Sequence, residues 1–349
     1  MTNINPEKEL LTFFTLTYNQ EKYIEETLEG IFNQTYSPLE IIISDDCSTD
    51  HTYEIIKKYV SQYKGPHKII INKNEKNLGL IKHFNKVISM CHGELLVAGA
   101  GDDISLPNRI QTLYNRWKQE KDSIMALVSS SYTIDNEGKE FSNSLFENKE
   151  DRIEDNFYTD GSWHGACVAY SSKIYNTFGN ITHNCYEDMV YFRRALMLGK
   201  ILFIKDKLVK YRIGGMSTNE SNIPKTYKEF KNLKIKELKR NNEVIKQLIE
   251  DANKIKNKNI KEGLLFTNKV LEKRIRFYDT NNYLEKLFLL LTLIPYFIVK
   301  RKNVIKSFRF KSHHWFRMIR DLLPDYINNI FYKNDFWLKK YIEKNSSNK

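Results

Sequence analysis

The chain has 349 residues, of which 41% are hydrophobic and 13% aromatic, so it can bury a large core and does not have the composition of a disordered protein. Its four cysteines form no Cys-x-x-Cys pair, which argues against a zinc site or a disulfide framework and favours a reduced, cytosolic setting. The net charge of +12 is uneven, since residues 1–220 carry 25 Lys and Arg against 30 Asp and Glu, whereas residues 221–349 carry 30 against 13.

This charge division predicts two parts. Residues 1–220 are expected to form a nearly neutral globular domain, and residues 221–349 a basic region that seeks an anionic surface. The N-terminus shows no basic-then-apolar signal segment.

Apolar runs and amphipathic stretches alternate through the first 131 residues. The runs predict buried strands, and the stretches between them carry apolar residues at helical spacing. We expect strands at 10–16, 40–44, 68–71, 94–99 and 125–131, and helices at 22–33, 50–63, 79–90 and 106–119. Strands that alternate with helices of this length predict an α/β fold with a doubly wound, mostly parallel sheet.

The pattern is less regular further on. A polar stretch from 135 to 160 is expected to be rich in loops, and a strand is expected at 163–170. A helix is expected near 187–196, and Val209-Lys210-Tyr211-Arg212 with Gly214-Gly215 closes the first domain near residue 220. For Trp163, at the start of the expected strand, core packing is favoured over a place in a binding pocket, and the role of His164 stays open.

The basic region is expected to be mainly helical. Residues 225–277 are Lys-rich with a helical pattern, and the apolar run at 287–299 falls short of the 20 or so residues that span a bilayer. Basic and aromatic residues follow, including His313 and His314, which we expect to be solvated. A solvated helical bundle, a nucleic-acid site and a membrane-surface segment are the alternatives. No nucleic-acid motif accompanies the charge, so we expect an anionic membrane surface as partner and no nucleic acid.

Two adjacent carboxylates, Asp102 and Asp103, follow the expected strand at 94–99. In open α/β sheets, ligands bind at the carboxyl ends of strands. Adjacent acids repel each other unless a cation or hydrogen-bond donors compensate, and Mg²⁺ or Mn²⁺ with a phosphate-bearing ligand would do so. The alternative is a loop that caps the next helix, with Ser105 and Pro107 at its start.

Two further acidic pairs stand at the ends of expected elements. Asp45 and Asp46 follow the strand at 40–44, and Glu187 and Asp188 open a later helix. The first pair could cap a helix, and Asp188 could complement a helix dipole for about 0.3–1 kcal/mol. Two acids exceed what one cap needs, so the first pair favours a binding role.

Five short motifs stand in a characteristic order between residues 8 and 217. They are Thr17-Tyr18-Asn19, Ile43-Ser44-Asp45-Asp46-Cys47-Ser48-Thr49-Asp50, Asn77-Leu78-Gly79, Gly101-Asp102-Asp103 and Tyr186-Glu187-Asp188. Together they resemble the inverting family 2 glycosyltransferases of the GT-A fold. The resemblance implies metal-dependent transfer of a hexosyl or N-acetylhexosaminyl group from a nucleoside-diphosphate sugar, normally a UDP-sugar. The implied acceptor is a hydroxyl of a glycan or a lipid-linked acceptor in bacterial surface polysaccharide synthesis.

The resemblance also implies roles for individual residues on the donor side. Thr17 and Tyr18 match positions that hold the nucleotide, Tyr18 by stacking on the base, and Asp46 matches a residue that hydrogen-bonds the base. Asp102 matches the acid near the ribose. Lys82, just after the Asn-Leu-Gly turn, is a looser candidate for binding the diphosphate.

For the chemistry, the resemblance implies Asp103 as the ligand of a divalent cation, Mg²⁺ or Mn²⁺. It implies Asp188 as the general base, with Glu187 beside it. The family's D-x-D spacing is missing, because Gly101 and Ile104 flank the acidic pair. Asp103 would therefore be the main protein ligand, with water and substrate supplying the rest.

Two statements about the whole protein follow from the resemblance. The Q-x-x-R-W motif of processive synthases is missing, so a non-processive enzyme is expected. Its setting would be cytoplasmic, held peripherally on the inner face of the cell membrane. An inactive sugar-nucleotide-binding or scaffold protein of the same fold is the alternative, against which the intact acidic set argues.

Overall fold

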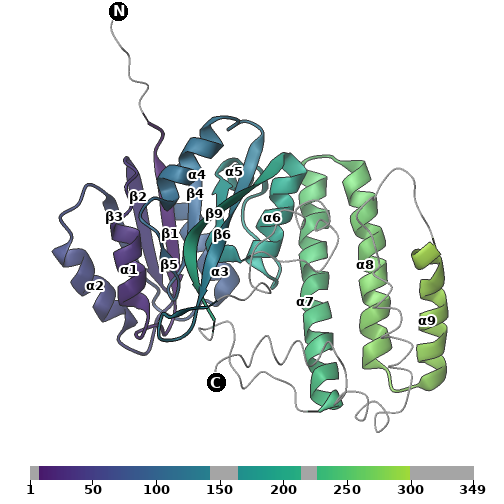
Figure 1. Cartoon of the computed structure of the whole chain (residues 1–349). Coiled ribbons are helices and arrows are strands. Elements are labelled where there is room, and N and C mark those ends of the chain that lie inside the picture. Colours follow the sequence, from purple (N-terminus) through teal and green to yellow (C-terminus); the bar gives the residue numbers. More distant parts are fainter. Residues whose placement is uncertain (1–7, 142–163, 214–225, 299–349) are drawn as a thin grey trace, which may run out of the picture. The chain divides into compact units, whose positions relative to one another are not determined.

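The computed structural model describes residues 8–141, 164–213 and 226–298 (Figure 1). The chain divides into two compact units. The second unit contains the helices from residue 226 onward together with a loop segment, residues 182–186, and the first unit contains the other described residues.

The first unit is built on a nine-stranded sheet in the order β3-β2-β1-β4-β8-β6-β9-β5, with β7 paired to β6. The strands are β1 (Leu11–Thr17), β2 (Leu39–Asp45), β3 (Lys68–Lys73), β4 (Leu95–Ala100), β5 (Ile104–Ser105), β6 (Ile124–Ile134), β7 (Glu140–Phe141), β8 (Val168–Ser171) and β9 (Lys200–Arg212). Strands β1 to β4 pair in parallel, β8 is antiparallel to both β4 and β6, and β5 is antiparallel to β9. The expected α/β fold with a helical C-terminal region is confirmed, with a sheet that is parallel in its first half and mixed in its second.

Helices pack against both faces of this sheet (Figure 1). They are α1 (Ile24–Phe32), α2 (Thr52–Gln62), α3 (Leu80–Met90), α4 (Arg109–Lys118), α5 (Lys173–Phe178), α6 (Glu187–Leu198) and the 3-10 helix η3 (Gly165–Cys167). Phe13 of β1 is buried in one core with residues of α1, α2 and α4. Phe14 packs instead on Phe84 of α3, whose ring also contacts Tyr191 of α6. Adjacent residues of β1 thus serve opposite faces, as the two-residue period of a strand requires.

Two local predictions were wrong. Ser105, expected to begin a helix, lies in β5 and pairs with Val209 of β9, and α4 begins only at Arg109. Residues 165–167, expected in a strand, form η3, and β8 begins after them. In the first case the strand is stabilised by pairing with a distant segment, which local helix-start signals do not reveal.

Strand β9 was not predicted. It runs over 13 residues and ends at Arg212, in the stretch that was expected only to close the domain. The charged triplet Lys205, Asp206 and Lys207 is exposed and interrupts its apolar pattern, and the register between β6 and β9 shifts nearby, at Ser129–Ser131. This irregularity hides the strand from a periodicity analysis.

The second unit contains α7 (Tyr227–Lys254), α8 (Lys258–Asp279) and α9 (Tyr283–Ile298). Helix α7 packs on α8, and α8 packs on α9, which confirms the helical character expected for 225–277. In the described ranges no helix is both long and apolar enough to span a bilayer. The basic and aromatic residues after 298, including His313 and His314, lie outside the described residues, as does Trp163.

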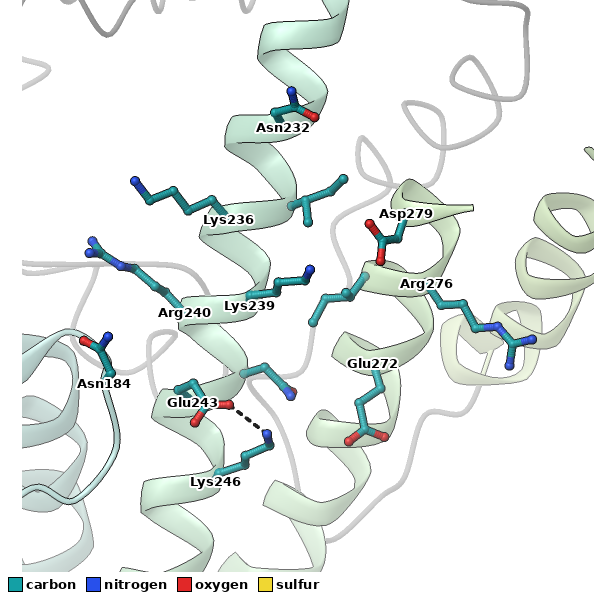
Figure 2. A pocket seen from close by; sticks show the side chains of 13 residues that line it. Asn184, Asn232, Lys236, Lys239, Arg240, Glu243, Lys246, Glu272, Arg276 and Asp279 are labelled. Carbon is teal, nitrogen blue, oxygen red and sulfur yellow. Dashed lines mark hydrogen bonds and ion pairs between the residues drawn. The ribbon is translucent and has the colours of Figure 1, made fainter. Parts of the chain in front are cut away.

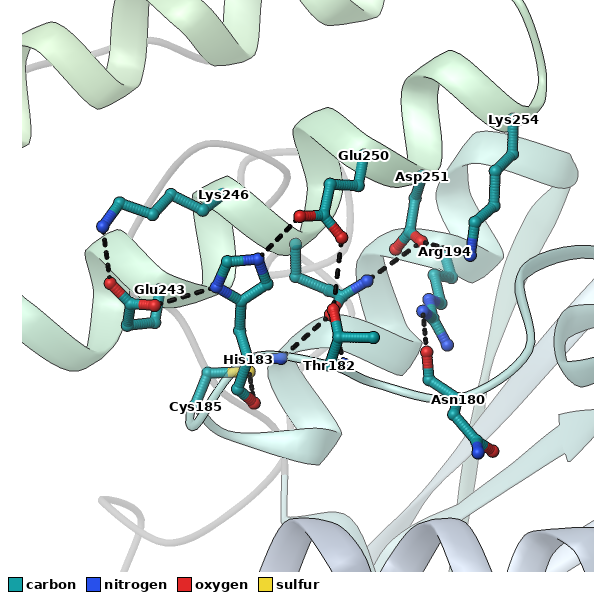
Figure 3. A network of polar contacts seen from close by, with 11 residues as sticks. Asn180, Thr182, His183, Cys185, Arg194, Glu243, Lys246, Glu250, Asp251 and Lys254 are labelled. Carbon is teal, nitrogen blue, oxygen red and sulfur yellow. Dashed lines mark hydrogen bonds and ion pairs between the residues drawn. The ribbon is translucent and has the colours of Figure 1, made fainter.

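Polar contacts fasten the loop segment of the second unit to α7 (Figure 3). The ring nitrogens of His183 lie 2.8 Å from Oε2 of Glu243 and 2.9 Å from Oε1 of Glu250. The backbone N–H and hydroxyl of Thr182 donate to Oε1 of Gln247 at 2.7 and 3.0 Å. The three α7 residues are spaced by three and four positions, so they share one helix face.

Candidate active site

The carboxyl ends of three neighbouring strands lie level at one edge of the sheet. In the parallel register, Thr17 at the end of β1 pairs with Asp45 at the end of β2. Leu16 pairs with Ala100, the last residue of β4. The polar residues that follow these strands are therefore brought to the same edge, where open α/β sheets bind their ligands.

The ends of β1 and β2 are tied together by hydrogen bonds. The hydroxyl of Thr17 donates to the carbonyl of Ser44 at 3.2 Å, and its carbonyl accepts from the N–H of Asp46 at 2.9 Å. Asn19, with a φ of 52°, donates its N–H to the Ser48 hydroxyl at 2.9 Å. Tyr18, between these two residues, is half-buried.

Asp46 holds the Asn77-Leu78-Gly79 turn against the end of β2. Its Oδ1 accepts from the Asn74 side chain at 2.8 Å and from the N–H of Leu78 at 2.9 Å. Its Oδ2 accepts from the N–H of Gly79 at 3.0 Å, and the residue is only 3% exposed. A carboxylate oxygen can accept two hydrogen bonds, so Oδ2 keeps capacity for one further donor.

Arg212 organises the acidic pair after β4. Its backbone N–H donates to Oδ1 of Asp103 at 2.8 Å, and its Nε donates to the carbonyl of Asp102 at 3.0 Å. The remaining guanidinium nitrogens donate to the carbonyls of Asp135 and Asn136 and to Oε2 of Glu26, the last at 2.7 Å. Because one buried residue contacts both members of the pair, it fixes their positions relative to β9.

A second buried arginine lies near the same pair. Arg109 is fully buried and donates to the carbonyls of Ala98 and Ala166 at 2.9 and 2.6 Å. Burial lowers its pKa to about 10, while the charge of Asp103 acts in the opposite direction. It therefore stays protonated at neutral pH and links β4 to η3.

The acidic residues of this site have shifted pKa values. Burial and the charge of Asp102 raise the pKa of Asp103 well above its usual range, although Arg212 and Arg109 counteract this. Burial raises the pKa of Asp188 to about 6, although the hydrogen bond from the N–H of Met189 and the charge of Arg193 lower it. Acids with displaced pKa values at a strand edge are typical of functional sites.

Glu187 and Asp188 open α6 and behave differently from each other. Burial and the charge of Asp188 raise the pKa of Glu187 to about 8. Oδ1 of Asp188 accepts from the N–H of Met189 at 2.6 Å, which stabilises its ionised form. The two carboxyls therefore share about one proton at neutral pH, and the hydrogen bond from Met189 favours the negative charge on Asp188.

A chain of contacts joins the acids of β4 to those of α6. Tyr211 precedes Arg212, and its ring stacks on His164 with centroids 4.0 Å apart. A Cβ placed on the next residue, Gly165, would lie 3.6 Å from Cβ of Asp188. Burial raises the pKa of the Tyr211 hydroxyl, and the charges of Asp103, Asp102 and Asp188 raise it further. The charges of both acidic sites thus act on one half-buried phenol.

The structure brings most of the predicted site residues to this edge. Lys82 is exposed on the first turn of α3, three residues after Gly79, whose N–H donates to Asp46, and it makes no hydrogen bond or ion pair in the described ranges. Arg109, Tyr211 and Arg212 were not predicted as site residues. The stretch Val209-Lys210-Tyr211-Arg212 indicated only the end of the first domain.

The donor set suits a hard divalent cation. Asp102 and Asp103 are carboxylates, which Mg²⁺ and Mn²⁺ prefer, and a cation would oppose the burial and the Asp102 charge that raise the pKa of Asp103. Among the described residues no three His, Cys, Asp or Glu side chains gather into a metal-binding group. A cation here would therefore take its remaining ligands from a diphosphate and water, which is how proteins commonly hold Mg²⁺.

Solved structures share this fold. A mannosyltransferase from Pyrobaculum calidifontis, solved with GDP-Man and Mn²⁺, matches with a TM-score of 0.54 at 15% identity, over 93% of this chain and 88% of that one. A structure of S. aureus TarS with UDP-GlcNAc matches with a TM-score of 0.50 at 19% identity, over 89% and 80%. At these identities the likeness shows the fold alone, the GT-A fold.

Sequence comparisons also find glycosyltransferases. A glycosyltransferase of Methanocaldococcus jannaschii is 36% identical over 149 residues, which span 41% of this chain and half of that protein. Glycosyltransferase GlyG of Streptococcus pneumoniae is 29% identical over 218 residues, or 58% of this chain and 71% of that protein. The family model for glycosyl transferase family 2 matches residues 12–197, more than half of the chain. The chain therefore belongs to glycosyl transferase family 2.

Proposed function

We propose that this glycosyltransferase is metal-dependent and inverting, and that it moves a sugar from a nucleoside diphosphate, normally UDP, to a hydroxyl of a glycan or lipid-linked acceptor. The contact chain from Asp103 through Arg212, Tyr211 and His164 to Asp188 carries the proposal. It lets one bound donor meet a cation-binding acid and a proton-accepting acid. The complexes of fold neighbours with UDP-GlcNAc, and with GDP-Man and Mn²⁺, support the donor class.

On the acceptor side, Asp188 is the proposed general base. The acceptor oxygen attacks the anomeric carbon, the bond from that carbon to the diphosphate oxygen breaks, and the hydroxyl proton passes to Asp188. A pKa of about 6 keeps this carboxylate ionised at neutral pH, and general-base catalysis contributes about 10²–10⁴-fold in rate. Displacement in line with the leaving group inverts the anomeric centre.

On the donor side, we propose that Tyr18 stacks on the base. Oδ2 of Asp46, which can accept a second hydrogen bond, accepts one from the N–H of a uracil. Thr17 and Asp102 line the nucleotide, and Lys82 reaches the diphosphate. When bound at Asp103, the cation supplies Lewis-acid stabilisation of the charge on the leaving diphosphate. Arg212 holds Asp103 in position for that ion.

We also propose that residues 1–220 form the catalytic domain and that the basic region, 221–349, holds the enzyme at an anionic membrane surface. Helix α9 supports this, because Leu284, Phe288 and Leu291 recur at spacings of four and three residues and are 73%, 65% and 53% exposed. Such a face suits a membrane interface, where a lipid-linked acceptor of a surface polysaccharide would be met.

Calorimetric titration with UDP, with and without Mn²⁺, tests the proposed function. The wild-type chain is expected to bind UDP more tightly with Mn²⁺. Asp188→Asn should retain this binding and lose transfer from a panel of UDP- and GDP-sugars. UDP binding that ignores Mn²⁺ would contradict the metal dependence, and undiminished transfer by Asp188→Asn would refute the assigned base.

A further inference from the structure

A groove of about 750 Å³ lies on the second unit, between α7, α8 and the loop segment (Figure 2). Basic side chains dominate its lining: Lys236, Lys239, Arg240, Lys246 and Arg276. Three acids, three asparagines and two isoleucines complete it. Its lining is therefore a net positive mixture of ionic and neutral polar groups.

Within the described part of the chain, three of these cations have no carboxylate partner. Lys246 pairs with Glu243 at 2.7 Å, and Arg276 pairs with Glu285 at 2.5 Å. Lys236, Lys239 and Arg240 make no ion pair with any described residue, and Arg240 instead lies over the Tyr186 ring, 5.0 Å from its centroid. Like charges spaced by three or four residues on a helix repel each other, so an anionic ligand would stabilise this arrangement.

Asn242 adds a second, independent observation. This groove residue is 6% exposed, and its Oδ1 is enclosed without a hydrogen-bond partner in the described ranges. A buried polar oxygen without a partner is unfavourable, and it requires a donor rather than another acceptor. A ligand hydroxyl can satisfy it, and a bare anion cannot, once rotation of the Asn242 side chain brings this enclosed oxygen to the groove.

We propose that this groove binds an anionic saccharide, with acid groups against Lys236, Lys239 and Arg240 and a hydroxyl donating to Asn242. Resting on the proposed function, we assign this saccharide as a segment of the acceptor. The isoleucines can contact the apolar faces of sugar rings. A hollow that includes acids fits a discrete ligand better than a flat anionic membrane.

The test is a titration of the full chain with three oligosaccharides of matched length: a tetragalacturonate, a glycerol-phosphate tetramer and neutral maltotetraose. At least one acidic oligomer is expected to bind about tenfold more tightly than maltotetraose. The acidic oligomer that binds identifies carboxylate or phosphate as the acid group. Equal affinity for all three probes would overturn the proposal.

Variants then locate the site. Lys236→Gln with Lys239→Gln should weaken acidic-oligomer binding about fivefold or more, whereas Lys228→Gln with Lys258→Gln, an equal charge loss outside the groove, should change it less than twofold. Asn242→Leu, which leaves the net charge unchanged, should also weaken acidic-oligomer binding. An equal loss of acidic-oligomer affinity in both double variants would show only a general charge effect. It would contradict the assignment of the binding site to the groove.

A membrane role for the groove is the remaining outcome. Sedimentation with vesicles of phosphatidylglycerol and phosphatidylcholine should be the same for the groove double variant and its control. Loss of vesicle binding in the groove variant, with saccharide binding unchanged, would overturn the proposal in favour of a lipid site. UDP titration with Mn²⁺ on the same samples reports the donor site, so a failure there counts against the proposed function and not against the groove.

Discussion

The backbone N–H of Arg212 lies 2.8 Å from Oδ1 of Asp103, and its guanidinium reaches the carbonyl of Asp102. Arg212 is 3% exposed and also pairs with Glu26. A lysine at this position keeps the positive charge, but its ammonium group lacks the planar, forked arrangement of hydrogen-bond donors of a guanidinium. Arg212→Lys keeps the backbone bond to Asp103 but removes the guanidinium donor from the carbonyl of Asp102, the residue before it, so it should raise the Mn²⁺ concentration needed for half-maximal UDP binding about tenfold or more.

Titrations of UDP at varied Mn²⁺ measure this effect. Lys210→Gln is a control on the same strand, since Lys210 pairs with Glu140 at 3.0 Å and is half-exposed. It should leave the Mn²⁺ dependence unchanged. An Arg212→Lys chain with wild-type Mn²⁺ dependence would show that Arg212 does not support the cation site.

The shifted pKa values of α6 predict a pH profile. A base with a pKa of about 6 loses its activity as pH falls below that value, so kcat/KM should decline below about pH 6 rather than near the ordinary value of Asp, about 4. Glu187 is already protonated in this range, so Glu187→Gln should leave the acidic limb in place. Steady-state rates from pH 5 to 9 measure this, and a limb that moves by one unit or more in Glu187→Gln would assign the titration to the other acid.

Gly101 leaves no room for a side chain where β4 ends. A Cβ there would stand 2.0 Å from Oε1 of Gln20 and 2.9 Å from Cγ2 of Thr17. Gly101→Ala should displace Asp102 and lower kcat/KM about tenfold or more. The nearest contact is a flexible side chain, so adding Gln20→Ala should restore part of the loss. If the double variant is no more active than Gly101→Ala, the backbone of β4 and not Gln20 transmits the effect.

The edge of the sheet could be predicted from sequence because its signals are local. Apolar runs followed by Asp46 and by Asp102 are continuous in the chain, and parallel pairing of β1, β2 and β4 places them level. The rest of the site depends on pairings between distant segments. Tyr211 and Arg212 reach the acids only through the ladders of β9 with β5 and β6, whose registers no local pattern specifies.

Asp46 illustrates a second limit. Its position at a strand end was predictable, but its three bonds to Asn74, Leu78 and Gly79 come from a turn some 30 residues later. The sequence contained both motifs without indicating that one holds the other. Similarly, the spacing of α7 predicts a helix but not that Asn242 loses its hydrogen-bond partner on burial.

Exposed apolar residues of α9 predict membrane binding. Burying Leu284 and Phe288 in an interface is worth roughly 1.5–3 kcal/mol each at full burial, so Leu284→Gln with Phe288→Gln should weaken binding to phosphatidylglycerol vesicles more than tenfold. Leu265→Gln, at a 40% exposed position of α8, is the control and should have little effect. Equal partition of the double variant and wild type would contradict membrane attachment through α9.

The contacts of His183 predict a pH-dependent stability. Burial alone would lower its pKa, but the bonds with Glu243 and Glu250 outweigh burial and raise the pKa above the ordinary value. A histidine whose pKa rises on folding stabilises the fold fully below its unfolded value, near 6.5, and loses that contribution as pH rises through the folded value. His183→Gln should therefore lower the melting temperature most at about pH 6, and the difference from wild type should shrink towards pH 9.

His51 provides the matched control for this experiment. Its pKa is also raised, by the hydrogen bond and charge of Glu21, but its side chain is 83% exposed, so solvent screens the pair. His51→Gln should leave the melting temperature nearly unchanged at every pH. If His183→Gln lowers the melting temperature equally at pH 6 and pH 9, the ring acts through packing alone, because only an ionised imidazole distinguishes the two conditions.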